Sequence, residues 1–163
     1  MYITLDMKPN VYIETSVISY YTAKPSRDLV TAGRQQLTRD WWEETRKHYK
    51  IFVSVLVLEE SKSGDKVASE KRLKTLKGLP VLQINDKAET LTEILIKEGA
   101  IPVDSTEDAL HIAIATVNGM DFLLTWNFNH INNAQKKLEI AKILEKYEYI
   151  CPAICSPEEL LGE

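Results

Sequence analysis

The sequence predicts an α/β protein, a three-layer α/β/α sandwich around a central, mostly parallel sheet. Two observations lead to this prediction. Short runs rich in β-branched and aromatic residues alternate along the chain with segments whose apolar residues recur at helical spacing. The run at 51–55 is apolar on both faces, as expected for a strand that helices cover on both sides. Alternating strands and helices form right-handed βαβ units, and such units build parallel sheets.

The elements of the first half alternate between strand and helix. In chain order we expect a strand at 10–14, a helix at 15–22, an amphipathic helical segment at 28–48, a strand at 51–55, a short helix at 56–61 and a helix at 65–77. Thr15-Ser16 can cap the first helix, and Pro25 lies where that helix has ended. Gly78 closes the last helix, because glycine readily adopts the left-handed conformation of a helix end.

The second half continues the alternation. In chain order we expect a strand at 80–84, a helix capped by Asp86, a loop at 101–104, a helix at 105–118, a strand at 121–125, a helix at 131–147, a strand at 149–154 and a terminal turn at 157–161. Two of these helices show apolar residues at helical spacing: Ala88, Leu91, Ile94 and Leu95 in one, and Ile131, Ala134, Leu138 and Ala141 in the other. The helix at 105–118 is apolar nearly all round and should be buried. Pro152 places the final strand at a sheet edge.

Length and composition indicate one globular domain. The chain has 163 residues, of which 44% are apolar and 27% are charged, so it can bury a single core. No apolar run reaches the roughly 18 residues of a membrane span, and no signal-peptide pattern opens the chain. We therefore expect a single cytoplasmic domain over residues 1–163, in which 1–8 form an N-terminal extension. Cys151 and Cys155 are too few for a disulfide framework and are expected to be reduced thiols.

The charge distribution allows a polyanionic partner without requiring one. The net charge of −4 weighs against a large nucleic-acid footprint, which usually appears as a basic domain. Lysine and arginine residues nevertheless cluster at 34–50 and at 62–77. These clusters are either solvated helix faces or basic surfaces that help to hold a polyanion beside an acidic pocket.

Four polar residues lie next to four separate apolar runs: Glu14, Glu60, Asp108 and Asn127. In an open parallel sheet, ligands bind beyond the carboxyl ends of the strands, so side chains delivered there from distant parts of the chain converge. Carboxylate and amide oxygens favour Mg²⁺ or Mn²⁺. The sequence therefore predicts a divalent-metal site and metal-assisted cleavage of a phosphodiester.

Each acidic residue also has a purely structural interpretation. Glu14 can be a surface carboxylate that a helix N-terminus stabilises. Glu60 has the neighbour Glu59, and the two point about 100° apart on a helix, so only one can face a site. Counting from the strand favours Glu60. Asp108 can complete a capping box with Ser105 as the N-cap.

The remaining polar residues near these positions also allow both a structural and a functional interpretation. His111 follows Asp108 by one helical turn and is either a core histidine with satisfied hydrogen bonds or a proton shuttle near neutral pH. Asn127 can offer an oxygen to a hard cation but brings no charge, and His130 can contact phosphate. Alternatively, this stretch is only a polar turn between a strand and a helix.

Four motifs together resemble the PIN-domain family of metal-dependent nucleases over nearly the whole chain. The matching segments are 11–19, 54–60, 108–115 and 123–127. In the family the first acid closes a strand, the second ends a serine-led apolar run, the third opens a helix and the fourth follows a Thr-x turn. The sequence departs from this pattern at two positions, with Glu14 where aspartate is usual and Asn127 in place of the fourth acid.

The resemblance implies single-stranded RNA as the substrate and Mg²⁺ or Mn²⁺ as the cofactor. It also implies a VapC-type toxin with a cognate antitoxin, and a homodimer. The leading hypothesis is an endoribonuclease whose metal is held by Glu14, Glu60 and Asp108, directly or through waters, while Asn127 orients a water or a phosphate oxygen. The first alternative is a PIN-like binding module that no longer cuts, because both departures weaken metal binding. A phosphatase-like or nucleotide-binding enzyme is the second, although the chain lacks a phosphate-binding glycine-rich loop.

Overall fold

The computed structural model describes residues 7–162, so most of the predicted extension at 1–8 lies outside the described residues. The strands are β1 (Asn10–Ile13), β2 (Lys50–Ser54), β3 (Val81–Leu82), β4 (Phe122–Leu124) and β5 (Ala153–Cys155). The α-helices are α1 (Thr15–Thr22), α2 (Leu29–Asp40), α3 (Val55–Ser61), α4 (Lys66–Leu76), α5 (Asp86–Lys97), α6 (Thr106–Val117) and α7 (Ala134–Lys146). Single turns of other helix types lie at Trp41–Thr45, Arg46–His48, Val103–Ser105 and Pro157–Leu160.

The five strands form one sheet in the order β3-β2-β1-β4-β5, and every neighbouring pair is parallel. The predicted parallel sheet is therefore confirmed. β1 pairs with β2 on one side and with β4 on the other, so the direction of winding reverses at β1. The crevice beyond the carboxyl ends of β1 and β4 is the place where open α/β sheets bind their ligands. β5 is an edge strand, as the proline at position 152 predicts.

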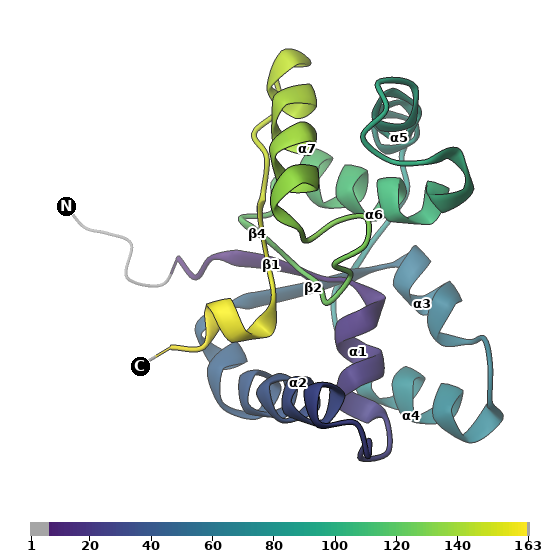
Figure 1. Ribbon diagram of the computed structural model, residues 1–163, viewed down its shortest axis with the longest axis vertical. Coiled ribbons are helices and arrows are strands. Elements are labelled where there is room, and N and C mark those ends of the chain that lie inside the picture. Colours follow the sequence, from purple (N-terminus) through teal and green to yellow (C-terminus); the bar gives the residue numbers. More distant parts are fainter. Residues whose placement is uncertain (1–6, 163) are drawn as a thin grey trace.

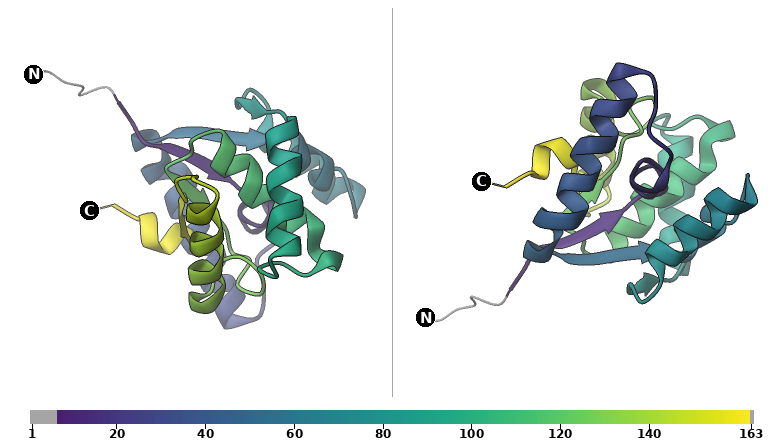
Figure 2. Two further views of the ribbon diagram at one scale, coloured as in Figure 1. Left: turned by 90° about the horizontal axis from the view of Figure 1, so that it is seen from above. Right: turned by 90° about the horizontal axis from the view of Figure 1, so that it is seen from below.

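Helices cover both faces of the sheet, which makes the predicted three-layer sandwich. Figures 1 and 2 show α5, α6 and α7 on one face and α1, α2 and α4 on the other. α3 begins where β2 ends and lies beside the carboxyl edge of the sheet (Figure 1). Within the described residues, no helix combines the length and the apolar character that a membrane crossing requires.

The core lies around β1 and α6. Val11, Tyr12 and Ile13 of β1 are completely buried, because helices and neighbouring strands surround the central strand. α6 is buried from Ala109 onwards over nearly its whole length, as its apolar sequence predicts. Burial of such continuous apolar surface is the main force that holds the layers together.

Two predicted helix caps are wrong by one residue. Glu14, rather than Thr15-Ser16, caps α1 through a hydrogen bond from the backbone N–H of Ser16. Asn85, rather than Asp86, caps α5. In both cases the extended residue just before the helix has the side chain that reaches the free N–H groups of the first turn.

The predicted apolar face of the last long helix is also wrong. α7 begins after Asn133 rather than at 131, and Leu138 is 58% exposed. The buried residues of α7 are Ile140, Ile143 and Leu144. The helix carries two apolar stripes, and a count that starts at loop residue Ile131 selects the stripe that faces solvent.

The segment at 28–48 is helical as predicted, but it is not one regular helix. α2 passes into a π-helical turn at Trp41–Thr45 and then into a 3₁₀ turn at Arg46–His48. Adjacent residues of an α-helix point about 100° apart. Here Trp41 and Trp42 are nevertheless both buried, and they pack against Tyr49 and Tyr21 respectively. The wider turn coincides with the burial of two neighbouring indole rings.

Both cysteines are free thiols, as predicted. Burial raises the pKa of the Cys151 thiol to about 11 and, together with the charge of Glu159, that of Cys155 to about 12. Thiolate formation is therefore disfavoured near neutral pH at both positions.

Candidate metal-binding site

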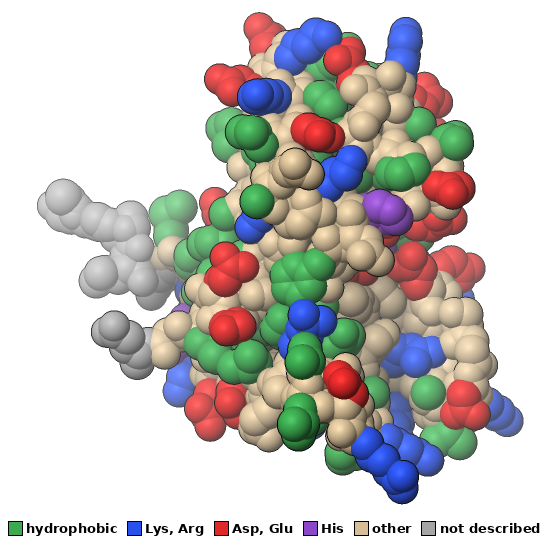
Figure 3. All heavy atoms as spheres, viewed as in Figure 1, with side chains coloured by type: hydrophobic (Ala, Val, Ile, Leu, Met, Phe, Trp, Pro, Cys, Tyr) green, Lys and Arg blue, Asp and Glu red, His purple; other side chains and the backbone are tan. Residues whose placement is uncertain are grey.

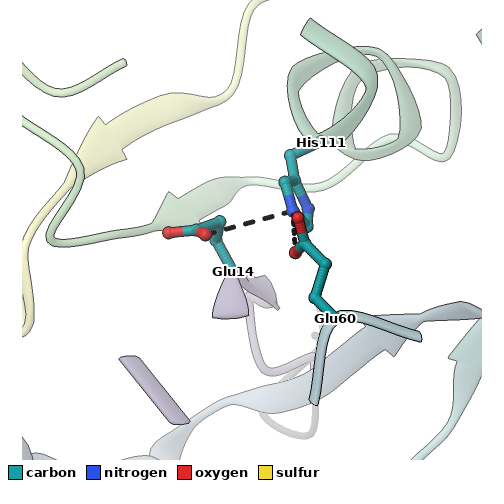
Figure 4. Close-up of side chains that lie close together, drawn as sticks. All are labelled: Glu14, Glu60 and His111. Carbon is teal, nitrogen blue, oxygen red and sulfur yellow. Dashed lines mark hydrogen bonds and ion pairs between the residues drawn. The ribbon is translucent and has the colours of Figure 1, made fainter. Parts of the chain in front are cut away.

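The candidate site lies at the carboxyl ends of β1, β2 and β4, where the winding of the sheet reverses. Glu14 follows β1 directly, α3 carries Glu60 away from β2, and Thr125 follows β4. α6 crosses this edge and contributes His111 (Figure 4). The convergence that the sequence predicts for distant elements is thus realised for Glu14 and Glu60.

Glu14 is a buried carboxylate, only 6% exposed, and three donors hold it. Its oxygens accept hydrogen bonds from the hydroxyls of Ser16 and Thr125, both at 2.5 Å, and from the backbone N–H of Ser16 at 3.2 Å. The backbone N–H of Glu14 also continues the sheet ladder by donating to Leu124. Glu14 is therefore fixed at the N-terminus of α1, where the helix dipole favours a negative charge, but it is not a surface residue.

Glu60 faces the site and Glu59 does not. The Glu59 side chain is 68% exposed and pairs with Lys62 at 3.4 Å. The Glu60 side chain is 31% exposed, and its Oε1 lies 2.7 Å from His111 Nε2 and accepts a hydrogen bond from the Thr15 hydroxyl. Burial alone would raise the pKa of Glu60, but the hydrogen bond and charge of His111 outweigh it and lower that pKa.

His111 is completely buried and has a partner at each ring nitrogen. Nε2 lies 2.7 Å from Glu60 Oε1 and 3.9 Å from Glu14 Oε2 (Figure 4). Nδ1 lies 2.7 Å from the Tyr12 hydroxyl, which in turn lies 2.7 Å from the Ser54 hydroxyl. Burial lowers the pKa of His111. The hydrogen bond with Glu60 and the surrounding carboxylates raise that pKa by more than burial lowers it, so the net shift is upward. The sequence allows His111 to be either a core histidine or a proton shuttle, and these interpretations do not exclude each other. His111 is a core histidine with a hydrogen-bond partner at each nitrogen, and it also faces Glu14 and Glu60.

Glu14, Glu60 and His111 together form a compact set of donors. One ligand atom from each residue lies within 4.8 Å of the other two. Donors at about 2.1 Å from one octahedral ion are separated by about 3 Å when adjacent and about 4.2 Å when opposite. The separations of 2.7 Å and 3.9 Å from Nε2 therefore need only small side-chain movements to surround an ion.

Asp108 and Asn127 form a second cluster with His130. Asp108 Oδ1 accepts a hydrogen bond from the Asn127 amide at 3.0 Å, and Oδ2 lies 2.8 Å from His130 Nδ1. Asn127 Oδ1 accepts from the backbone N–H of His130 at 3.1 Å. Asp108 lies outside the set of three clustered donors, but its charge contributes to the raised pKa of His111.

The capping-box interpretation of Asp108 is wrong. The Ser105 side chain makes no capping hydrogen bond to α6, and its backbone is not in the extended conformation usual for an N-cap. Asp108 points instead to the loop after β4, where its two oxygens bind Asn127 and His130. Figure 3 shows acidic side chains and a histidine gathered near this loop, on the side toward α3.

Several supporting residues are not predicted as part of the site from the sequence. Thr125 and Ser16 hold Glu14, while Tyr12 and Ser54 hold His111. Ser16, Ser54 and Thr125 give a weak hint, because they lie in the segments that resemble the family motifs. Tyr12 gives none, because an aromatic residue in the middle of a strand is ordinary.

The fold of this chain is the PIN-domain fold of VapC toxins. By sequence, the chain matches no protein-family model and no curated protein. By structure, it matches VapBC2 from Rickettsia felis bound to a DNA fragment from their promoter, with 17% identity, a TM-score of 0.58 and coverage of 90% of this chain and 98% of that chain. It also matches Mycobacterium tuberculosis VapC20, a sarcin-ricin loop cleaving toxin, with 16% identity, a TM-score of 0.56 and coverage of 74% and 92%. At these identities the likeness establishes a shared fold over most of the chain.

Proposed function

We propose that this protein is a metal-dependent endoribonuclease that cleaves single-stranded RNA. The observation that carries the proposal is the cluster of Glu14, Glu60 and His111 at the point of the PIN fold where the winding of the sheet reverses. Two carboxylates and a buried imidazole converge there without a neighbouring lysine or arginine in an ion pair with any of them among the described residues. Such a set fits a divalent cation better than an organic ligand.

The donor chemistry fits Mg²⁺ or Mn²⁺. Glu14 and Glu60 would bind the ion directly, and Asp108 would act through a water molecule. His111 Nδ1 already has the Tyr12 hydroxyl as a partner, so Nε2 is the nitrogen that faces the ion. Mg²⁺ is usually held by carboxylates and waters, so the imidazole favours Mn²⁺ of the two.

The protein's own groups would orient the substrate and the attacking water. When bound, the ion would supply a water whose pKa is lower than that of bulk water, and positive charge for the phosphate oxygens. Asp108, which contacts Asn127 and His130, would accept a hydrogen bond from water, while Asn127 and His130 would contact a phosphate oxygen. Thr125, Ser16 and Thr15 fix the carboxylates, which keeps the site preorganised.

The shared fold also supports the proposed partners. The likeness to the Rickettsia felis VapBC2 structure supports a role as the toxin of a toxin–antitoxin pair, with an antitoxin protein that restrains it. The likeness to VapC20, which cleaves the sarcin-ricin loop, supports RNA as the substrate. A homodimer and a cytoplasmic site of action are part of the same proposal.

A second candidate function is a PIN-like module that binds RNA or a protein without cutting. The observation that favours it is the Asn127 side chain, which donates a hydrogen bond to Asp108 where a carboxylate would add charge. Ligand charge is a main determinant of affinity for divalent cations. Under this alternative, calorimetry detects no Mn²⁺ binding at millimolar concentrations.

The test compares Asp108→Asn with wild type on single-stranded RNA, in Mn²⁺ and in EDTA. We expect Asp108→Asn to lower the cleavage rate by about 100-fold, at the upper end of what the loss of an outer carboxylate costs a metal site. The matched control is Glu107→Gln, because Glu107 is the exposed neighbour on the same turn of α6. Circular dichroism should show that both variants fold. Equal cleavage by wild type and Asp108→Asn, or cleavage that survives EDTA, would contradict the proposal.

A further inference from the structure

We propose that Arg34 and Phe128 form a nucleotide platform at the rim of this site, where Phe128 stacks on a base and Arg34 binds a phosphate of single-stranded RNA. The inference rests on the proposed function, because it assigns the part of the protein that positions the substrate. Arg34 lies on α2 and Phe128 on the loop between β4 and α7. Neither residue belongs to the cluster of Glu14, Glu60 and His111.

The loop between β4 and α7 connects the platform to the acidic residues. The backbone N–H of Trp126 donates to the Ser16 hydroxyl at 2.8 Å, and that hydroxyl holds Glu14. Asn127 donates to Asp108. Phe128 is the next residue, so its Cα lies about 3.8 Å from that of Asn127. The proposed platform is thus part of the same loop as the residue that donates to Asp108.

Arg34 lies against two aromatic rings of this loop. Its guanidinium carbon is 4.8 Å from the centroid of the Phe128 ring and 5.6 Å from that of Trp126. Trp126 is fixed, because its ring is stacked on Tyr20 at 5.7 Å and its indole N–H donates to Thr38 at 2.8 Å. Phe128 meets Trp126 edge-on at 6.0 Å. The Phe128 ring thus has a defined orientation although the residue is 38% exposed.

Among residues 7–162, no hydrogen bond uses the guanidinium N–H groups of Arg34. A guanidinium that stacks on a ring through its face keeps its in-plane N–H groups for a phosphate. In the described part of the chain, Arg34 takes part in no ion pair. Figure 3 shows basic and hydrophobic side chains side by side over α2 and this loop. The charge of Arg34 acts on the exposed carboxylate of Asp28 but forms no ion pair with it, and a positive charge beside an acidic site helps to attract a polyanion.

The combination of an exposed ring and an adjacent cation fits single-stranded RNA. Proteins that bind single strands stack bases on aromatic side chains and contact the backbone with arginine or lysine, whereas paired bases are not available for such stacking. If the contact between Arg34 and Phe128 served only to stabilise the loop, removing either residue would lower stability slightly and leave RNA affinity unchanged.

The experiment measures binding of a fluorescent single-stranded oligoribonucleotide by anisotropy in EDTA, and its cleavage in Mn²⁺. The variants are Arg34→Gln and Phe128→Leu. The matched control is Arg39→Gln, which makes the same change of charge on the same helix, where the side chain bonds Gln36 and does not lie over Trp126 or Phe128. We expect Phe128→Leu to weaken binding by about 5- to 100-fold, as for loss of one stacked base. Arg34→Gln should weaken binding by about 5-fold or more, because a charge-assisted contact with a phosphate is lost. Arg39→Gln should bind as wild type does.

The salt dependence separates the roles of the two residues. Arg34→Gln should reduce the slope of log Kobs against log salt by about 0.7, because one phosphate contact to a single strand is lost, and Phe128→Leu should leave that slope unchanged. Mn²⁺ binding should be the same in all variants. Wild-type affinity in both variants, while wild type binds and cleaves RNA, would overturn the platform and leave the proposed function intact. A wild-type protein that binds Mn²⁺ but neither binds nor cleaves RNA would overturn the proposed function and the platform with it.

Discussion

Glu59 and Glu60 are neighbours in the sequence but lie in different environments. Glu59 pairs with Lys62 in solvent, whereas Glu60 contacts His111 and Thr15. The 100° step between adjacent helical residues makes such a division unavoidable, and the length of the preceding strand sets which of the two faces inward. Counting from the strand therefore identifies Glu60 correctly, while the sequence alone gives no reason to pair it with His111.

The two glutamates provide a matched test of the metal site. We expect Glu60→Gln to raise the dissociation constant for Mn²⁺ by at least about 10-fold, since a charged ligand is replaced by a neutral one. Glu59→Gln removes the same charge one residue away and should leave the constant unchanged. Isothermal titration calorimetry at constant salt measures both. Equal affinities of the two variants would show that Glu60 does not bind the ion.

At the scale of elements, α3 is the helix that brings Glu60 to the site, and it has a buried serine at each end. Ser54 caps the helix, because its hydroxyl accepts from the backbone N–H of Val57 at 3.2 Å, and it also lies 2.7 Å from the Tyr12 hydroxyl. The hydroxyl of Ser61 is buried but has no hydrogen-bond partner among the described residues. The hydroxyl of Ser54 therefore stabilises the fold through its hydrogen bonds, whereas the burial of the Ser61 hydroxyl costs free energy.

These two serines should respond differently to alanine. Ser54→Ala removes a cap and leaves the Tyr12 hydroxyl with one partner fewer, so it should cost about 1–3 kcal/mol of unfolding free energy. Ser61→Ala removes an unsatisfied buried hydroxyl and should be neutral or stabilising by up to about 1 kcal/mol. Urea unfolding followed by circular dichroism gives both values. A loss of stability in Ser61→Ala equal to that in Ser54→Ala would mean that Ser61 has a partner.

The loop between β4 and α7 is the other element that the site depends on. It is a polar turn, as one interpretation of the sequence holds, and it also supplies the Asn127 and His130 contacts to Asp108. The periodic pattern predicts that this helix begins at residue 131, inside the loop, because Ile131 is apolar. Ile131 is indeed buried, but α7 begins only at Ala134. The hydrogen bonds of Asn132 and Asn133 with backbone groups of the loop end that extension. Local polar contacts thus override the periodic pattern.

At the scale of the whole molecule, the proposed ion connects three elements that are distant in the sequence. Glu14 follows β1, and Glu60 lies on α3, which follows β2. His111 lies on α6, the helix that precedes β4. An ion that binds these groups only when they are assembled stabilises the folded state over the unfolded state.

Bound metal should therefore raise the melting temperature. At a Mn²⁺ concentration of about 100 times the dissociation constant, linkage adds about 2.7 kcal/mol. For a chain of this size that corresponds to a rise of roughly 5–10 °C. Differential scanning fluorimetry in Mn²⁺ and in EDTA measures the shift, and the Glu60→Gln variant should show a smaller one. The absence of any shift in wild type at millimolar Mn²⁺ would count against an ion at this site.

The sequence by itself determines the class of fold, because the alternation of strand and helix patterns and the apolar character of 51–55 and 105–118 can be recognised locally. It also indicates that Glu14, Glu60, Asp108 and Asn127 lie near one edge of the sheet. Only the tertiary structure decides how these residues divide into two clusters, with His111 joined to Glu14 and Glu60, and His130 joined to Asp108. The physical reason is that strand order and helix rotation are set by packing across the whole core, whereas a pattern in the sequence reports only which face of its own element each residue occupies.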